Sequence, residues 1–249
     1  MEYYGLTKAI PKHWLTLIKP KNILEQNNLT REQLTFTINK RIKPLFKIQS
    51  QDIYWELISD KVEQPSALNV WLDLFPFLES INWDEIFERI FLITNEPALQ
   101  SFQYKVINRI INCKYNLFKW KITNSPLCTY CSTVDTIDHH LFSCQTTQKF
   151  WQEVTKWTEK KLKVKLNFTT CEILFGIPFH GDINLHIINK FIIHGKQYLN
   201  NRKCNSLPII FNDFLNEFKM KVKALCNLYK QESTNTKKVE ITLKLGQLL

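Results

Sequence analysis

Several side chains able to bind a metal ion lie close together in this 249-residue chain. Cys128 and Cys131 are separated by two residues, and a histidine pair and Cys144 follow. Two thiolates at this spacing bind one side of a Zn²⁺ ion from a tight turn, and a histidine and a further cysteine complete a tetrahedron. Because four protein ligands leave no position open for water or substrate, the pattern predicts a structural zinc site without catalysis at the metal.

Two other interpretations of the Cys-x2-Cys pair are ordinary buried thiols and a redox-active pair. A redox-active Cys-x2-Cys pair is typically found next to a βαβ unit. The sequence pattern around these residues is helical, so it does not favour a redox role. The remaining cysteines have no such partners in the sequence and are expected to lie in the core; they are Cys113, Cys171, Cys204 and Cys226.

Either of two adjacent histidines can serve as the zinc ligand. On a continuous helix His140 and Cys144 share one face, whereas His139 and Cys144 diverge by well over a quarter turn. His139 therefore binds only if it lies in a turn, or in a distorted first turn, before the helix. A metal nuclease site built from Asp135, Asp138 and the histidines is less favoured, because acidic residues in a first helical turn already complement the helix dipole.

The elements that position this cluster are mostly helical. Apolar side chains recur at helical spacing within residues 83–91, 99–110, 150–157, 185–199 and 211–229. Alternation of polar and apolar residues from Lys161 to Phe168 makes a short strand compete with a helix there. Residues 200–208 are expected to connect the last two helices, and a loose polar tail is expected from Glu232 onward.

The predicted fold class is therefore mostly α, a helical domain with a small embedded zinc knuckle. Three segments are expected along the chain. Residues 1–95 form an N-terminal helical segment that is acidic in its second half, and residues 96–170 form the zinc-knuckle region with basic flanking helices. Residues 171–249 form a C-terminal helical hairpin and a polar tail.

The net charge of +10 is unevenly distributed. Residues 51–100 hold 2 basic and 10 acidic residues, whereas residues 101–170 hold 11 basic and 4 acidic ones. A polyanion would be attracted to the second segment and repelled by the first. The residues expected to contact phosphates are Lys105, Arg109, Lys114, Lys119, Lys121, Lys149, Lys156, Lys160 and Lys163.

Two alternatives accompany this nucleic-acid interpretation. The basic residues are mostly lysine, the usual solvated surface residue. Tyr130, next to Cys131, is a candidate for stacking on an unpaired base, and simple packing on the knuckle is its alternative.

Composition excludes other classes of function. With only 5 glycines, the chain is poor in the loops that cradle phosphates of small nucleotides, and no small-molecule substrate is expected. No apolar run approaches the ~18 residues of a membrane span, and the N-terminus has no secretory signal. The odd number of cysteines suits a reducing compartment, so we expect an intracellular protein, nuclear or cytoplasmic.

The string from Ser125 to Val154, SPLCTYCSTVDTIDHHLFSCQTTQKFWQEV, resembles a region of known proteins. It is similar to the zinc-binding region that follows the polymerase in reverse transcriptases of non-LTR (LINE-type) retrotransposons. Those proteins share the Cys-x2-Cys pair, an acidic residue followed by histidine, a cysteine four residues later and a Phe-Trp pair. The resemblance extends to residues 3–14, 99–117 and 172–177, and it implies that His139 is the fourth ligand.

The resemblance also implies a function. In that family this region is thought to hold template RNA or target DNA near the polymerase, so RNA or DNA and the polymerase portion of a retroelement protein are the implied partners. The Tyr/Phe-x-Asp-Asp motif of polymerases is absent from this sequence, and nothing in it resembles the endonuclease, so no enzyme activity is expected. Zinc is expected to hold the helix after Cys144 against the helix of Lys105 as one basic surface.

Two alternatives to this function stay open. One is a zinc-stabilised helical module that contacts protein, which the acidic segment from Asp52 to Glu96 favours because it suits a basic partner. The other is an element fragment without a function of its own.

Overall fold

The computed structural model describes residues 35–38, 41–44, 47–58, 65–231 and 237–249 and divides the chain into two compact units, 1–64 and 65–249. Within the first unit, β1 (Thr35–Ile38) and β2 (Arg41–Pro44) pair antiparallel, and α3 (Ser50–Ile58) follows. The segment 3–14 that contributes to the sequence resemblance lies outside the described residues. The three-segment division predicted from the sequence stays a prediction.

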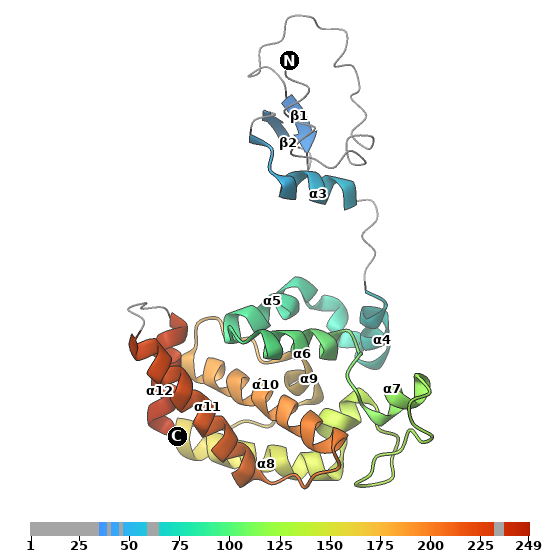
Figure 1. The fold of residues 1–249 in the computed structure, drawn as a ribbon, viewed down its shortest axis with the longest axis vertical. Coiled ribbons are helices and arrows are strands. Elements are labelled where there is room, and N and C mark those ends of the chain that lie inside the picture. The colour runs from blue at the N-terminus through green and yellow to red at the C-terminus, as the bar shows by residue number, and fades with distance from the viewer. Residues whose placement is uncertain (1–34, 39–40, 45–46, 59–64, 232–236) are drawn as a thin grey trace, which may run out of the picture. The chain divides into compact units, whose positions relative to one another are not determined.

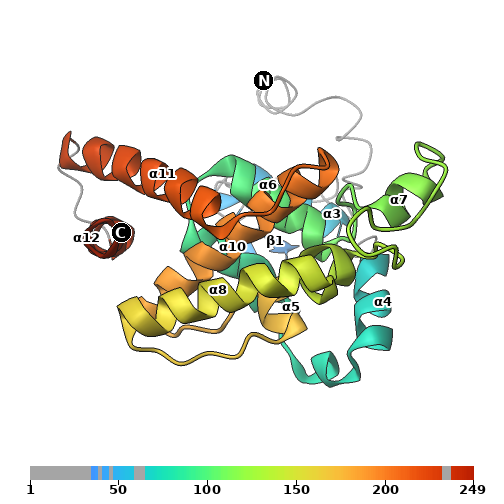
Figure 2. The same ribbon diagram turned by 90° about the horizontal axis from the view of Figure 1, so that it is seen from below.

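The second unit consists of helices, which confirms the predicted mostly α fold class. Its elements are α4 (Ser66–Leu74), η3 (Pro76–Ser80), α5 (Trp83–Ile93), α6 (Pro97–Ile107), α7 (Lys114–Lys119), η4 (His139–Ser143), α8 (Gln145–Leu162), α9 (Thr170–Phe175), α10 (Ile183–Cys204), α11 (Phe211–Gln231) and α12 (Lys237–Leu248). In Figures 1 and 2, α10 runs through the middle of this unit, and it contacts α5, α6, α8, α11 and α12. None of the described helices is long and apolar enough to cross a membrane.

Side chains at the starts of several helices explain where they begin. Asn82 accepts a hydrogen bond from the amide of Asp84 at the start of α5, and Asp182 does the same for the first turn of α10. Thr169 and Glu172 form a reciprocal capping box at the start of α9. These caps satisfy amides that have no partner within the helix, so they fix the helix ends.

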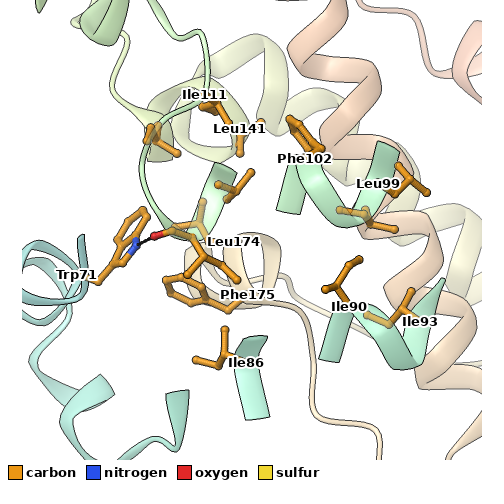
Figure 3. Packing of buried hydrophobic residues seen from close by; sticks show 14 of the residues in the cluster. Trp71, Ile86, Ile90, Ile93, Leu99, Phe102, Ile111, Leu141, Leu174 and Phe175 are labelled. Atoms are coloured by element: carbon orange, nitrogen blue, oxygen red, sulfur yellow. Dashed lines mark hydrogen bonds between the residues drawn. The ribbon is translucent and has the colours of Figure 1, made fainter. Parts of the chain in front are cut away.

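Two hydrophobic clusters hold the second unit together. The first gathers apolar side chains of α4, α5, α6 and α9, and Figure 3 shows Trp71 and Phe175 meeting there. The indole Nε1 of Trp71 donates a hydrogen bond to the carbonyl of Ile107 over 2.7 Å. The second cluster joins α8, α10, α11 and α12 around Phe191 and Phe214. Because α10 contributes to both clusters, it is buried on most of its surface.

The structure corrects three sequence expectations at element boundaries. Residues 163–169 form neither the expected strand nor a helix, because α8 ends at Leu162 and Lys163 takes a left-handed conformation that stops it. The connection expected at 200–208 is shorter, since α10 continues to Cys204. The expected loose tail is wrong for α12, where the i, i+4 pair Ile241 and Leu245 is buried.

Lys196 of α10 is a charged residue in the interior of this unit. Its Nζ donates to the Gln103 side-chain carbonyl and, over 2.9 Å, to the carbonyl of Leu174. Burial lowers its pKa to about 7, because the low-dielectric interior disfavours the ammonium. The unfolded chain, with a lysine pKa of about 10.4, therefore binds more protons than the folded one at pH values between 7 and 10.

Lys196→Met is expected to flatten the pH dependence of stability. The wild-type free energy of unfolding should rise relative to that of the variant by about 3 kcal/mol between pH 7 and pH 10, with no further difference in slope well below pH 7. Urea unfolding across this pH range measures the difference. The exposed Lys165→Met is the control; a parallel pH profile for wild type and Lys196→Met would contradict the assignment.

Candidate metal centre

Four side chains form a compact cluster beside the N-terminus of α8. The ligand atoms of Cys128, Cys131, His139 and Cys144 all lie within 4.8 Å of one another. The Sγ atom of Cys144 lies 3.9 Å from that of Cys128 and 3.8 Å from that of Cys131. The Nε2 atom of His139 lies 3.3 Å from the Sγ of Cys131. The cluster thus brings together the three thiols and one imidazole that the sequence pattern predicted.

A short hairpin places the first two cysteines. Leu127 and Val134 form an isolated antiparallel bridge, and the amide of Cys128 donates to the carbonyl of Thr133 over 2.7 Å. The amide of Ser132 donates a hydrogen bond to the carbonyl of Cys128, and Ser132 has a left-handed backbone conformation with a φ of 59°. This tight turn directs both thiols to the same side. We refer to residues 127–144 as the knuckle.

A widened helical turn places His139. Residues 139–143 form the π-helical η4, in which the amide of Cys144 donates to the carbonyl of His139 over 3.1 Å. On a regular α-helix these two residues would point about 140° apart, so the wider turn is what brings them together. The distorted turn that the sequence required for His139 is therefore present in the structure.

His140 occupies a different environment. Its Nδ1 lies 2.8 Å from the Oδ2 of Asp135, and both side chains are almost fully buried. Burial lowers the pKa of His140, so the ring is neutral and donates to the carboxylate. Because this hydrogen bond and the burial hold His140 away from the thiols, the geometry favours His139 as the fourth ligand.

Asp135 joins the knuckle to its surroundings. Burial alone would raise the pKa of Asp135, but the hydrogen bond from His140 and the charge of Lys203 outweigh it and lower the pKa. Lys203 Nζ lies 3.1 Å from Oδ1, and the amide of Lys114 donates to Oδ2 over 3.1 Å. The carboxylate thus connects the knuckle to the start of α7 and the end of α10. The sequence suggested a helix-dipole role for it and, as the less favoured interpretation, a place in a metal nuclease site.

The thiols differ in how readily they lose a proton. Burial opposes the Cys144 thiolate, but the charge of Lys203 and the backbone amides of Thr146 and Thr147 outweigh it and lower the pKa to about 7. Burial raises the pKa of Cys128 to about 11. Burial also lowers the pKa of His139, which keeps its imidazole neutral and able to act as a ligand.

The arrangement fits a tetrahedral zinc ion. With Zn–S bonds of about 2.3 Å, two thiolates on one tetrahedral ion lie about 3.8 Å apart, close to the separations in the cluster. Three sulfurs and one imidazole nitrogen are also a common donor set of structural zinc sites. The four residues would hold the metal, which would supply a cross-link between the hairpin and the N-terminus of α8.

The lysines predicted to contact phosphates differ in how exposed they are. Lysines on α6, on α7 and its following turn, and along and after α8 are exposed: Lys105, Lys119, Lys121, Lys149, Lys156, Lys160 and Lys163. Lys114 is half-buried. Lys156 pairs with Glu153 over 2.7 Å at the surface. Their contact with phosphate stays a prediction.

Arg109 differs from the sequence expectation. Because α6 ends at Ile107, Arg109 does not share a helix face with Lys105; it has a φ of 60° beyond the helix end. Its guanidinium lies 4.1 Å from the ring centroid of Trp71, and burial lowers its pKa. This position makes Arg109 a packing residue of the α4–α6 region. The helix predicted within residues 99–110, on which Arg109 would lie four residues after Lys105, ends before Arg109.

Tyr130 is engaged within the chain. Its hydroxyl donates a 2.6 Å hydrogen bond to the carbonyl of Leu207, and the Nζ of Lys203 lies 5.9 Å from its ring centroid. These contacts tie the knuckle to the end of α10. They favour the packing alternative over the stacking role.

The helix of Lys105 and the helix after Cys144 are also joined differently from the expectation. α10 contacts both α6 and α8, and Figures 1 and 2 show it between them. The knuckle therefore anchors α8 through Cys144, while α10 sets the position of α8 relative to α6.

Comparison with known proteins agrees with this site. Residues 69–151 match a family model described as zinc-binding in reverse transcriptase. The matched segment, about a third of the chain, runs from α4 into α8 and includes all four cluster residues. This segment is therefore similar to the zinc-binding domain of reverse transcriptases, which confirms the resemblance at that level; its LINE-type origin stays a prediction. No curated protein and no solved structure matches the chain.

Cys131→Ser is expected to abolish stoichiometric zinc binding. Loss of one thiolate should also lower the free energy of unfolding of the metal-loaded chain by more than about 2 kcal/mol, since metal binding and folding of a knuckle are coupled. Native mass spectrometry and thermal unfolding measure the two effects. Cys171→Ser, outside the cluster, is the control and should keep the metal. Full zinc retention by Cys131→Ser would contradict the site.

The two histidines are expected to separate metal binding from stability. His139→Ala should lose zinc, whereas His140→Ala should keep it and destabilise the fold by about 2 kcal/mol, because it removes a hydrogen bond to a buried carboxylate. Zinc content and urea unfolding of both variants provide the test. Zinc loss in His140→Ala with retention in His139→Ala would reverse the assignment.

Proposed function

We propose that this chain binds RNA or DNA as a zinc-stabilised accessory region of a retrotransposon-type reverse transcriptase, of the LINE type, and catalyses no reaction itself. One observation carries the proposal. The thiol–imidazole cluster, in a segment similar to the reverse transcriptase zinc-binding type, overlaps the end of a stretch without a single carboxylate. Residues 97–134 contain five basic residues and no Asp or Glu. The proposed setting is intracellular, nuclear or cytoplasmic.

A stretch of this charge favours a phosphate backbone. Binding of lysine and arginine to phosphates releases condensed counterions, which supplies most of the sequence-independent affinity for nucleic acids. Carboxylates within the same stretch would oppose that attraction, and the stretch has none. Its exposed cations are Lys105, Lys119 and Lys121, whereas Lys114 is half-buried and Arg109 packs on Trp71.

A second set of lysines extends the proposed basic surface along α8. The spacings between Lys149, Lys156 and Lys160 place them on one helical face, and Lys163 follows directly after the helix end. Glu153 pairs with Lys156, but both side chains are largely exposed. An exposed pair of this kind contributes little and is easily broken. The face therefore retains attraction for a polyanion.

The cluster supports the proposal by holding the two basic elements. Cys144 is the residue immediately before α8, so its attachment fixes where that helix begins. On the other side, the carbonyl of Asp135 accepts from the amide of Tyr115, and its carboxylate accepts from the amide of Lys114. A metal bound at the cluster would thus order α7 and α8 together, which is what a pre-organised binding surface needs.

Binding to a protein partner is a second candidate, favoured by α5. Phe91 and Leu92 are more than half exposed on this helix. They lie within residues 51–100, the acidic part of the chain. Exposed apolar side chains in an acidic setting suit a basic protein surface, such as the polymerase portion of a retroelement protein.

Fluorescence anisotropy of labelled single-stranded and duplex RNA and DNA tests the proposed function. The zinc-loaded chain should bind with an affinity that falls steeply as salt rises, and stripping the metal should weaken binding. Absence of binding at low salt would overturn the proposal and shift the search to protein partners.

Replacing Lys119 and Lys121 by alanine is expected to weaken binding and to reduce its salt dependence. Loss of two phosphate contacts should lower the slope of log affinity against log salt by about 1.4 for a single strand, with zinc content unchanged. Lys219 and Lys223, exposed on α11, provide a matched double-alanine control. Equal slopes for the wild type and the Lys119/Lys121 variant would exclude these lysines from the interface.

A further inference from the structure

Helix α7 and the residue after it expose three aromatic rings. Tyr115 is 43% exposed, Phe118 45% and Trp120 42%. Rings of this size are normally buried more deeply than this, in a core or against a partner. Within the described part of the chain, these three rings form no ring pair with another aromatic side chain, unlike the rings of the two cores. Figures 1 and 2 both show α7 at the edge of the 65–249 unit, projecting from the bundle.

Two of these rings lie between two lysines on one helical face. Tyr115 and Phe118 are three residues apart, and Lys114 and Lys119 occupy the neighbouring positions of the same face. Side chains at i and i+3 have Cβ atoms about 5–6 Å apart. The opposite face contains Asn116, whose amide nitrogen donates to the carbonyls of Arg109 and Ile111. The helix is therefore attached by one side and presents the aromatic and basic side to solvent.

The backbone holds this face in place although the helix is short. The amide of Lys121 donates to the carbonyl of Phe118, and the amide of Ile122 donates to that of Leu117. With Lys121 at a φ of 59°, this is the hydrogen-bond pattern of a Schellman end. At the other end, Asp135 accepts the amides of Lys114 and Tyr115. The rings thus sit on a backbone fixed at both ends.

The chemistry of this face points to an unpaired strand. An aromatic ring offers a stacking surface to any base, and adjacent cations hold the phosphates. Bases in a duplex are already stacked on one another, so only an unpaired strand can use the rings. The absence of carboxylates across residues 97–134 also makes the face unsuited to a basic protein.

We propose that Tyr115 and Phe118 stack on the bases of a single-stranded RNA or DNA while Lys119 and Lys121 contact its phosphates. This inference rests on the proposed nucleic-acid binding and adds the structure of the ligand and the residues that recognise it. It also moves the stacking role from Tyr130, whose hydroxyl is bonded to Leu207, to α7.

Anisotropy with short labelled single strands, the matching duplex, and an abasic single strand tests the proposal. Replacing Tyr115 and Phe118 by alanine should weaken binding of the single strand at least about tenfold, because each stacked base contributes a substantial share of the affinity. Affinity for the abasic strand and the duplex, which offer no accessible base faces, should change less than about twofold. RNA and DNA versions of the strand distinguish the two sources of unpaired bases.

Three further variants test whether the aromatic rings themselves, at these positions, are required for binding. Tyr115→Leu with Phe118→Leu keeps apolar surface but removes the rings and should lose affinity like the alanine pair. The exchanged pair Tyr115→Phe with Phe118→Tyr keeps both rings and should bind like the wild type. Phe77→Ala removes an exposed ring from η3, outside the basic stretch, and should have no effect. Zinc content of each variant verifies that the knuckle is intact.

The outcomes separate this inference from the proposed function. Wild-type binding with an unchanged alanine pair would overturn the stacking role alone, as would a leucine pair that binds like the wild type. Equal losses on the abasic and natural strands would do the same, since they would show that the rings do not contact bases. No binding of the wild-type chain to any strand would overturn the nucleic-acid function itself.

Discussion

The carboxylate of Asp135 lies where the knuckle, the start of α7 and the end of α10 meet. It is 1% exposed and accepts hydrogen bonds from His140, Lys203 and the amide of Lys114. A buried carboxylate is tolerated only when charge and hydrogen bonds compensate for its lost hydration. These three partners come from three different parts of the chain, so their meeting at one carboxylate constrains how those parts are arranged.

This constraint extends beyond the partners themselves. His140 is held by Asp135, and the adjacent His139 is thereby directed toward the thiols through the widened turn of η4. Lys203 is held at the last turn of α10, beside the ring of Tyr130. The position of the metal cluster relative to α7 and α10 therefore depends on electrostatics inside the protein in addition to the four ligand residues.

Features that depend on residues close together in the sequence were predictable. The ligand set follows from cysteine and histidine spacing over 128–144, and helical stripes such as that of α5 follow from local apolar periodicity. The distorted turn of His139 was deduced as a condition of its binding. Helices in mostly polar segments were more difficult to predict. The helix α12 was not predicted, because the lysines around Ile241 and Leu245 make its short apolar stripe difficult to recognise in the sequence.

Features that depend on distant residues could not be predicted. Asp135 and Lys203 are 68 positions apart, and Arg109 contacts Trp71 beyond the end of α6, which the helical spacing over residues 99–110 placed too late. The exposure of Tyr115 and Phe118 could not be predicted either, since apolar periodicity favours burial of aromatic residues. Only the fold shows that α7 is attached by its other side.

The attachment of α8 at Cys144 makes that helix a lever. It has 18 residues and is about 27 Å long. A change of about 10° in its direction at the knuckle would displace its far end, near Lys160, by about 5 Å, a distance comparable to one turn of helix. Contacts of α8 with α10 and α11 along its length oppose such a swing. A small change in the positions of the four ligand atoms would therefore cause its largest displacement at the end of α8 that is farthest from them.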